Sequence, residues 1–271
     1  MRLIDVHAHL DYPPLSENIN AVIERAREKG VKRIIANGTH PQANRAVLEL
    51  SKTYKDIVRP ALGFYPTHIQ EVSEEAFDCE LDFMKKQKNE LVALGEVGLD
   101  KKFAKEDMQT SLNPQVYSQS TQELFRKQVW GFEKIISFAE KSKLPLIIHT
   151  RKAEQEVIDL LESSNLKPSQ IIMHCFCGKK RLVQQVRENN WNFSIPVSVI
   201  KLQQFQDLVK ETPLNQLLTE TDAPFLGPIL GEPNEPANVE LSIEKIAQIK
   251  GLTKEETADN IFMNYQKLFK K

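Results

Sequence analysis

Residues 3–9 read Leu-Ile-Asp-Val-His-Ala-His, a short apolar run that ends in two histidines. Similar runs that end in one histidine occur at residues 146–149, Leu-Ile-Ile-His, and at residues 171–174, Ile-Ile-Met-His. A brief apolar run of this kind is typical of a strand that is buried on both faces. Along the whole chain such runs alternate with longer stretches of helical periodicity, and this alternation decides the fold class.

Eight runs are predicted to be strands: Leu3–Val6, Arg33–Ala36, Val58–Leu62, Leu91–Leu94, Leu146–Ile148, Ile171–Met173, Asn192–Ile195 and Leu217–Thr219. Helical spacing of apolar residues predicts helices at Ile19–Lys29, Gln42–Tyr54, Thr121–Lys141, Glu154–Leu161, Lys180–Glu188, Val239–Ile249 and Thr253–Leu268. Eight strands with intervening helices in 271 residues predict an α/β fold, a single (β/α)8 TIM-type barrel domain over residues 1–271. A doubly wound open sheet is the alternative, although it usually has fewer strands in a chain of this length.

Two stretches interrupt the alternation, Lys101–Ser120 and Ala223–Pro236. The first is long and polar, and the second contains four prolines and two glycines. Both follow predicted strands, on the side where barrel enzymes carry their active-site loops.

Composition limits the classes of function and the cellular compartment. The chain has 37 acidic and 36 basic residues, for a net charge of -1, so no global positive field attracts nucleic acid. Three cysteines are too few for a disulfide framework. The N-terminus resembles no signal peptide, and no apolar run approaches the ~18 residues of a membrane span. We therefore expect a soluble, cytoplasmic protein.

Metal-ligating side chains follow the predicted strands. His7 and His9 are two residues apart, so both point to the same face of an extended chain. In a barrel the carboxyl ends of the strands converge, which would bring together six such residues: His7, His9, Glu96, His149, His174 and Asp222. Imidazoles and carboxylates are ligands for Zn, Mn, Fe or Co. Six ligands exceed what one tetrahedral site needs and suffice for two ions about 3.5–4 Å apart, with Glu96 as the bridge. Asp222 is a candidate ligand, general base, or both.

Several blocks of the sequence, in order, resemble the TatD family of metal-dependent hydrolases within the amidohydrolase superfamily, over essentially the whole chain. The blocks are Ile4-Asp5-Val6-His7-Ala8-His9-Leu10-Asp11, Gly95-Glu96-Val97-Gly98-Leu99-Asp100, Ile148-His149-Thr150-Arg151, Met173-His174-Cys175-Phe176, Leu218-Thr219-Glu220-Thr221-Asp222-Ala223-Pro224-Phe225 and Pro233-Asn234-Glu235-Pro236.

The resemblance implies a deoxyribonuclease, described in many members as a 3′–5′ exonuclease, that uses Zn, Mg or Mn. It implies that His7, His9, Glu96 and Asp222 surround one ion, and that Glu96, His149 and His174 surround the other. Some relatives are instead deacylases of wrongly charged tRNA. This sequence departs from the family pattern at Tyr65, where many members have histidine before proline. Tyr65 can still donate one hydrogen bond.

Substrate capture would depend on residues near the mouth of the barrel. Arg151, two residues after His149, is the leading candidate to hold a phosphate, and Tyr65 is the second substrate-binding candidate. Further candidates are the cations Lys101, Lys102, Lys105, Lys152, Lys179, Lys180 and Arg181, and the base-stacking residues Phe103, Tyr117 and Phe225. The expected substrate is nucleic acid with a single-stranded end.

Three hypotheses for function remain open at this point. The leading one is a two-metal phosphodiesterase that acts on DNA, with Asp222 and Glu96 as its catalytic residues. The second keeps the metal centre but changes the bond to an ester or amide, as in a D-aminoacyl-tRNA deacylase. The third is a catalytically inactive binding protein, which would have no need of six metal ligands. Neither the oligomeric state nor the choice of metal follows from the sequence.

Overall fold

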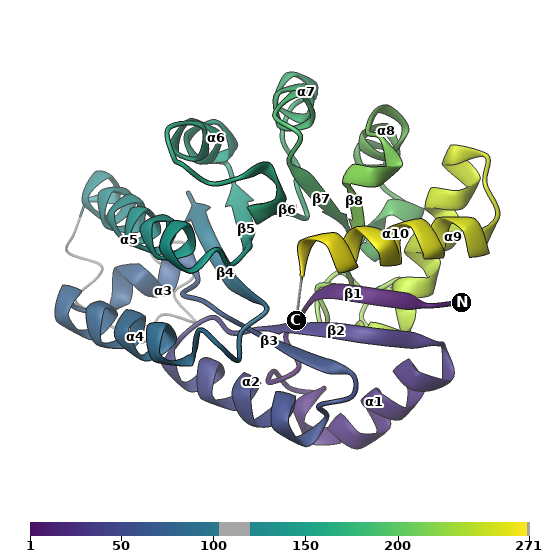
Figure 1. The fold of residues 1–271 in the computed structure, drawn as a ribbon, viewed down its shortest axis with the longest axis horizontal. Helices are drawn as coiled ribbons and strands as arrows, with labels where there is room; N and C mark the ends of the chain where they lie inside the picture. The colour runs from purple at the N-terminus through teal and green to yellow at the C-terminus, as the bar shows by residue number, and fades with distance from the viewer. Residues whose placement is uncertain (103–119, 270–271) are drawn as a thin grey trace.

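The computed structural model describes residues 1–102 and 120–269. Eight parallel strands form one sheet in the order β1 to β8, and helices on the outside follow the strands (Figure 1). The strands are β1 (Leu3–Ala8), β2 (Val31–Asn37), β3 (Val58–Leu62), β4 (Ala93–Asp100), β5 (Leu146–Arg151), β6 (Ile171–His174), β7 (Asn192–Ile195) and β8 (Leu217–Thr219). The helices are α1 (Ile19–Glu28), α2 (Pro41–Thr53), α3 (Pro66–Glu71), α4 (Glu74–Gln87), α5 (Thr121–Ser142), α6 (Glu154–Glu162), α7 (Lys180–Glu188), α8 (Gln203–Glu211), α9 (Val239–Lys250) and α10 (Lys254–Leu268).

Contacts between β1 and the end of β8 nearly close the sheet into a barrel. Ala8 forms a parallel bridge with Ala223, and the Asp222 amide donates to the His7 carbonyl at 2.8 Å. The Thr219 hydroxyl donates to the Ile4 carbonyl at 2.7 Å. The predicted TIM-type barrel is therefore confirmed, and the doubly wound open sheet is excluded.

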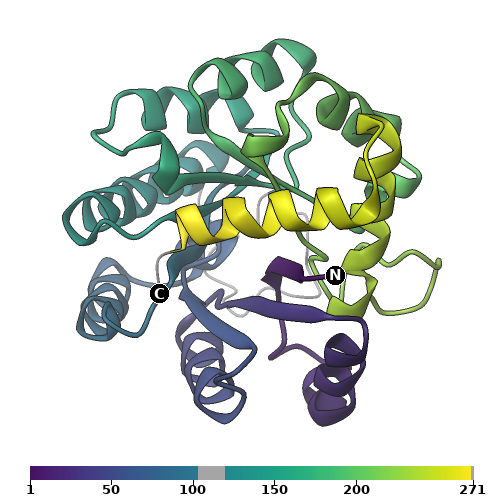
Figure 2. The same cartoon turned by 45° about the vertical axis from the view of Figure 1, so that its right-hand side comes forward.

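Helix α10 identifies the closed end of the barrel. It packs against β1 and β8 and against two short 3₁₀ turns, Pro168–Gln170 and Leu214–Gln216, that precede β6 and β8 (Figure 2). These turns lie at the amino ends of the strands, so α10 covers that end. A capping box starts the helix: the Thr253 side chain accepts from the Glu256 amide, and the Glu256 side chain accepts from the Thr253 amide. The opposite end, at the carboxyl ends of the strands, is left for the site.

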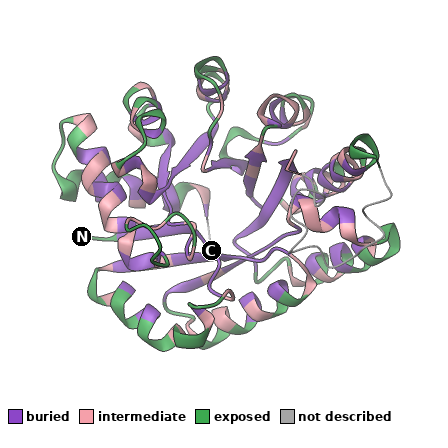
Figure 3. Cartoon of the chain, turned by 180° about the vertical axis from the view of Figure 1, so that it is seen from behind, coloured by how far each residue is buried: buried purple, intermediate pink, exposed green. Residues whose placement is uncertain are grey.

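Burial follows the layered arrangement of a barrel. The strands are buried along nearly their whole length, whereas each helix buries one face and exposes the other (Figure 3). One continuous apolar cluster joins the strands to the inward faces of the helices. Within the described residues, no helix is both long and apolar enough to cross a lipid bilayer.

The fourth strand differs most from the sequence prediction. It was expected at Leu91–Leu94, but it runs over Ala93–Asp100 and contains Glu96 in its middle. Polar residues and two glycines end the apolar run early, yet here they lie inside the barrel. Gly98 has φ 140°, and a Cβ there would lie 2.1 Å from the His149 carbonyl oxygen. A side chain at Gly98 would thus prevent β5 from approaching β4.

Three helices were absent from the prediction, namely α3, α4 and α8. Helices α3 and α4 pack against α5, and α8 packs against α9. Such tertiary packing supplies most of the stability of helices in proteins. The predicted loop at Ala223–Pro236 is confirmed, since it holds no regular helix or strand before the 3₁₀ turn at Pro236–Asn238. Residues 103–119 of the other predicted loop lie outside the described residues.

Candidate metal centre

The six predicted ligands meet at the carboxyl end of the barrel. His7 belongs to β1 and His9 follows it. His149 lies in β5, His174 ends β6, and Asp222 comes three residues after β8. Glu96, in β4, lies beside the four histidines. Side chains that are up to 215 residues apart in the sequence therefore surround one small volume.

Four donor atoms gather on one side of Glu96. The Nε2 atoms of His7 and His9 lie 3.1 Å apart. Asp222 Oδ1 is 3.4 Å from each of these nitrogens. Glu96 Oε2 is 3.6 Å from His7 Nε2 and 3.4 Å from His9 Nε2. All four side chains thus direct a ligand atom at a common point.

The other carboxylate oxygen of Glu96 faces a different pair of imidazoles. Glu96 Oε1 lies 2.8 Å from His149 Nδ1 and 3.6 Å from His174 Nε2. His7 borders this group too, because its ring stacks on His174 with centroids 3.7 Å apart. Two sets of donor atoms lie within 4.8 Å of one another, namely His7, Glu96 and His174, and His7, His9 and Asp222.

These distances fit metal coordination. With metal–ligand bonds of about 2.0–2.2 Å, neighbouring ligands of a tetrahedral or octahedral ion lie about 2.8–3.6 Å apart. Every donor–donor distance given above, from 2.8 to 3.6 Å, falls in that range. His149 Nδ1 is buried and makes no hydrogen bond despite lying 2.8 Å from a carboxylate oxygen. Such an atom pair is expected when both atoms face an ion rather than each other.

The charges of the site favour bound cations. Burial raises the pKa of Glu96, but His7, His149 and His9 outweigh it and hold that pKa well below its ordinary value. Burial likewise raises the pKa of Asp222, and His9, His174 and His7 bring it below the ordinary value. Both carboxylates are therefore ionised at neutral pH, as metal ligands must be.

The four imidazoles divide into two kinds. Burial and the neighbouring histidines lower the pKa of His7 and of His174. Burial also acts to lower the pKa of His9, but Asp222 and Glu96 raise it well above its ordinary value. For His149, Asp100 and Glu96 overcome burial and raise the pKa to about 9. In the metal-free protein, carboxylates therefore hold protons on His9 and His149.

Two carboxylates behind the ligands have no role in the sequence-based interpretation. Asp100 Oδ2 lies 3.2 Å from His149 Nε2, and Glu220 Oε2 lies 2.9 Å from His174 Nδ1. Both carboxylates are fully buried. A signal for Asp100 was present, because Glu96, Gly98 and Asp100 alternate on one face of an extended chain. Finding their partners required the tertiary fold.

Arg151 and Tyr65 also form hydrogen bonds with Asp100. Arg151 Nε donates to both carboxylate oxygens at 2.9 Å, and the Tyr65 hydroxyl donates to Oδ2 at 2.8 Å. Burial raises the pKa of Asp100, but His149 and Arg151 lower it to about 2. Because Asp100 is an ionised acceptor, it takes the one hydroxyl proton of Tyr65. The Tyr65 oxygen in turn accepts from Arg151 Nη2 at 3.4 Å.

A cavity of about 550 Å³ opens above the ligands. Arg151, Tyr65, Lys102 and His68 contribute polar groups to its lining. Tyr12, Phe225 and Leu226 also line it; the rings of Tyr12 and Phe225 are 5.9 Å apart, and each packs against His9. Among the predicted base-stacking residues, Phe225 is thus at the cavity, whereas Phe103 and Tyr117 lie outside the described residues, as does the cation Lys105.

The other predicted cations have varied surroundings. Lys101 pairs with Glu156, and Lys180 pairs with Glu211 at 2.6 Å. Arg181 bonds to Gln155 at 2.5 Å. Among the predicted cations that the structure describes, Lys102 and Arg151 line the cavity above the ligands.

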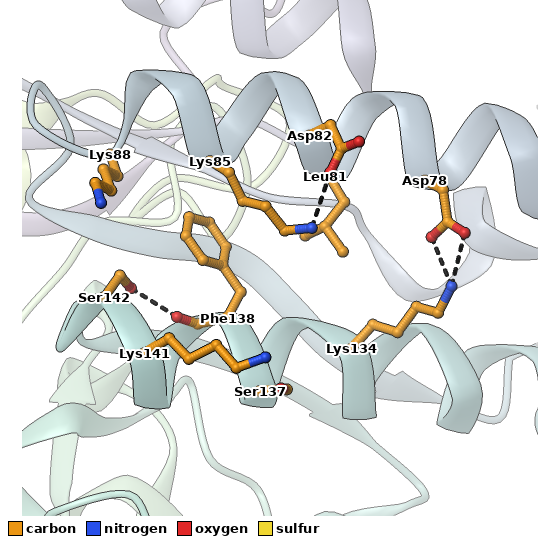
Figure 4. Close-up of a pocket in the computed structure, with 10 residues that line it drawn as sticks. All are labelled: Asp78, Leu81, Asp82, Lys85, Lys88, Lys134, Ser137, Phe138, Lys141 and Ser142. Carbon is orange, nitrogen blue, oxygen red and sulfur yellow. Dashed lines mark hydrogen bonds and ion pairs between the residues drawn. The ribbon is translucent and has the colours of Figure 1, made fainter.

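A second cavity, of about 530 Å³, lies between α4 and α5 on the outside of the barrel (Figure 4). Four lysines border it, and two of them pair with aspartates, Lys134 with Asp78 at 2.6 Å and Lys85 with Asp82 at 2.8 Å. Lysines near helix carboxyl ends complement the helix dipole. Its lining contains no histidine, so it offers no catalytic chemistry comparable to that of the first cavity.

Comparison with known proteins identifies the family. Residues 4–270 match the family model described as TatD related DNase. The human (Homo sapiens) protein deoxyribonuclease TATDN3 is 32% identical over 275 residues, which cover 99% of this chain and 95% of the human protein. YabD of Bacillus subtilis (strain 168), described as an uncharacterized metal-dependent hydrolase, is 34% identical over 277 residues and 99% of each chain.

A solved structure supports the same fold. The crystal structure of YjjV from Escherichia coli, described as a TatD homolog, matches with a TM-score of 0.83 at 24% identity, covering 99% of this chain and 98% of that one. The family model and the curated relatives confirm the resemblance expected from the sequence blocks, and with it a metal-dependent hydrolase rather than an inactive binding protein. The chain belongs to the TatD family of metal-dependent hydrolases.

Proposed function

We propose that this chain is a phosphodiesterase that hydrolyses DNA from an end and uses two divalent ions, Zn, Mg or Mn. The observation that carries the proposal is the placement of Glu96. Its Oε2 lies near His7, His9 and Asp222, and its Oε1 lies near His149 and His174. One carboxylate that faces two sets of ligands is suited to bridge a pair of ions.

The two ions, when bound, would lower the pKa of a shared water and polarise the bond under attack. The chain itself supplies the ligands and a proton acceptor. Asp222 is suited to the second task, because its pKa is low enough to leave it ionised and its Oδ1 lies 3.4 Å from two ligand nitrogens. Glu96 would hold the centre together, and Asp222 would take the proton of the attacking water.

The cavity favours a nucleotide as substrate. Arg151 is anchored to Asp100, yet 41% of its side chain is exposed at the cavity, where it can contact a phosphate. The cavity also has an apolar part, where Tyr12 and Phe225 offer aromatic surface to a base. A net charge of -1 means that capture depends on such local groups. Relatives named deoxyribonuclease agree with this choice.

The deciding experiment is hydrolysis of single-stranded DNA by metal-stripped protein that is resupplied with Mg, Mn or Zn. One oligonucleotide carries a 5′ label and another a 3′ label, and Glu96→Ala is the matched control. A 3′–5′ exonuclease should give a ladder from the 5′-labelled strand and a labelled mononucleotide from the 3′-labelled one. If protein that binds two ions cleaves neither strand with any ion, the phosphodiesterase is excluded, and esters such as aminoacyl-tRNA become the substrates to assay.

A further inference from the structure

The four histidines of the metal centre are not supported alike from behind. His149 and His174, the two that face Glu96 Oε1, each contact a buried carboxylate through their other ring nitrogen. His9 Nδ1 contacts only the neutral backbone carbonyl of Asn37 at 3.1 Å, as far as the described residues go. His7 Nδ1 is buried and has no hydrogen-bond partner among them.

Donor and acceptor chemistry fixes the orientation of His149. Asp100 receives N–H groups that can only donate, Arg151 Nε at 2.9 Å and the Lys102 amide at 2.7 Å, so both of its oxygens act as acceptors. His149 Nε2, 3.2 Å from Asp100 Oδ2, must therefore carry a hydrogen. The lone pair available for a metal is then on Nδ1, the atom that faces Glu96 Oε1.

Glu220 occupies the corresponding place behind His174. His174 Nδ1 lies 2.9 Å from Glu220 Oε2, and the Ser194 hydroxyl bonds to the same oxygen. With Nδ1 as the donor, the lone pair of His174 is on Nε2, which faces Glu96 Oε1 at 3.6 Å. Carboxylates placed behind ligating histidines set the tautomer and raise the basicity of the ring.

We propose that Asp100 and Glu220 are the positioning residues of one ion, the ion held by His149, His174 and Glu96 Oε1. The proposal rests on the two-ion centre proposed above. Each carboxylate acts through a histidine and contacts no substrate. Among the described residues no carboxylate contacts the outer ring nitrogen of His7 or His9, so the two ion positions differ in what holds their histidines.

Metal binding tests this directly. Metal-stripped wild type, Asp100→Asn and Glu220→Gln are titrated with Zn²⁺ against a chromophoric chelator. Wild type should bind two ions, and each variant should lose about 10–100-fold in affinity for one ion while the other ion is unaffected. Asp5→Asn is the matched control, because Asp5 is also a fully buried carboxylate but accepts from His7 N, Thr221 N and the Thr221 hydroxyl and from no imidazole. It should keep both affinities.

A spectroscopic readout separates positioning from a merely structural role. In Zn²⁺-loaded wild type with ¹⁵N-labelled histidine, two-bond ¹H–¹⁵N spectra should place the retained hydrogen of His149 on Nε2 and that of His174 on Nδ1. Asp100→Asn should shift only the ring signals of His149 in these spectra, and Glu220→Gln only those of His174. Circular dichroism confirms that both variants are folded. Retention of both ions at wild-type affinity by both variants would overturn this inference alone. A wild type that binds a single ion would overturn the two-ion centre together with it.

Discussion

Glu96 Oε1 lies 2.8 Å from Nδ1 of His149, and these buried atoms do not form a hydrogen bond with each other. The separation of these two atoms is that of neighbouring ligands of one cation. The same carboxylate reaches His9 Nε2 with its other oxygen at 3.4 Å. The predictions below concern this arrangement and the cavity above it.

Glu96→Ala should abolish hydrolysis and leave the barrel folded. The substitution removes the only described carboxylate that contacts both pairs of imidazoles, so the two ions lose their shared ligand. Turnover on the labelled oligonucleotide and circular dichroism of the variant check both parts. Full activity in Glu96→Ala would rule out the bridging role.

Asp222→Asn should lower the single-turnover rate about 10²–10⁴-fold, the usual contribution of a general base. Asparagine keeps an oxygen near His7 and His9 but has no carboxylate to accept a proton. Oligonucleotide affinity, measured by fluorescence anisotropy, should stay near that of wild type. An unchanged single-turnover rate would remove Asp222 from the catalytic residues.

Metal binding should release protons and strengthen as the pH rises. At pH 7 the metal-free protein holds protons on His9 and on His149, whose pKa is about 9, whereas the low pKa of His7 and of His174 leaves them neutral. Ligation needs the deprotonated ring, so protons compete with the metal below about pH 9. Titration calorimetry in buffers of different ionisation enthalpy measures the release. Equal apparent enthalpies in all buffers would contradict it.

Arg151→Lys should raise KM for the oligonucleotide about 10–100-fold with a smaller effect on kcat, because a charge-assisted hydrogen bond is worth about 1.5–3 kcal/mol. Lysine keeps the charge but cannot hold Asp100 and a phosphate with one planar group. Steady-state kinetics provide the measurement. Lys141→Ala, in the cavity between α4 and α5 (Figure 4), is the control and should leave KM unchanged. Equal KM values for wild type and Arg151→Lys would argue against phosphate contact.

Phe225→Ala should weaken binding of a normal strand end and spare an end that lacks a base. Phe225 is 47% exposed and packs against Tyr12 beside the ligands, and stacking on one base contributes about 1–3 kcal/mol. Kinetics on oligonucleotides with a normal or an abasic terminal nucleotide should differ for wild type and converge for the variant. Metal content serves as the control, because Phe225 also touches His9. A variant that still discriminates between the two ends would exclude base stacking at Phe225.

The sequence by itself determined the barrel and predicted which side chains gather at its mouth. Strands buried on both faces have to be apolar, so runs such as Leu146–Ile148 were visible without a structure. The histidines that end those runs could be assigned to one mouth, because parallel strands bring their carboxyl ends together. Periodicity missed β4 beyond Leu94, since Glu96 and Asp100 are polar residues that only the closed barrel buries.

Only the tertiary structure decided how the ligands are supported. The contacts of Asp100 with His149 and Arg151, and of Glu220 with His174, join residues about 50 positions apart. Such contacts depend on strand register and on side-chain direction, which local sequence does not encode. Tyr65 and Arg151 were predicted to face a substrate, and the fold places both on Asp100 as well. A buried carboxylate gathers every donor within reach, because an unpaired charge in the barrel would be costly.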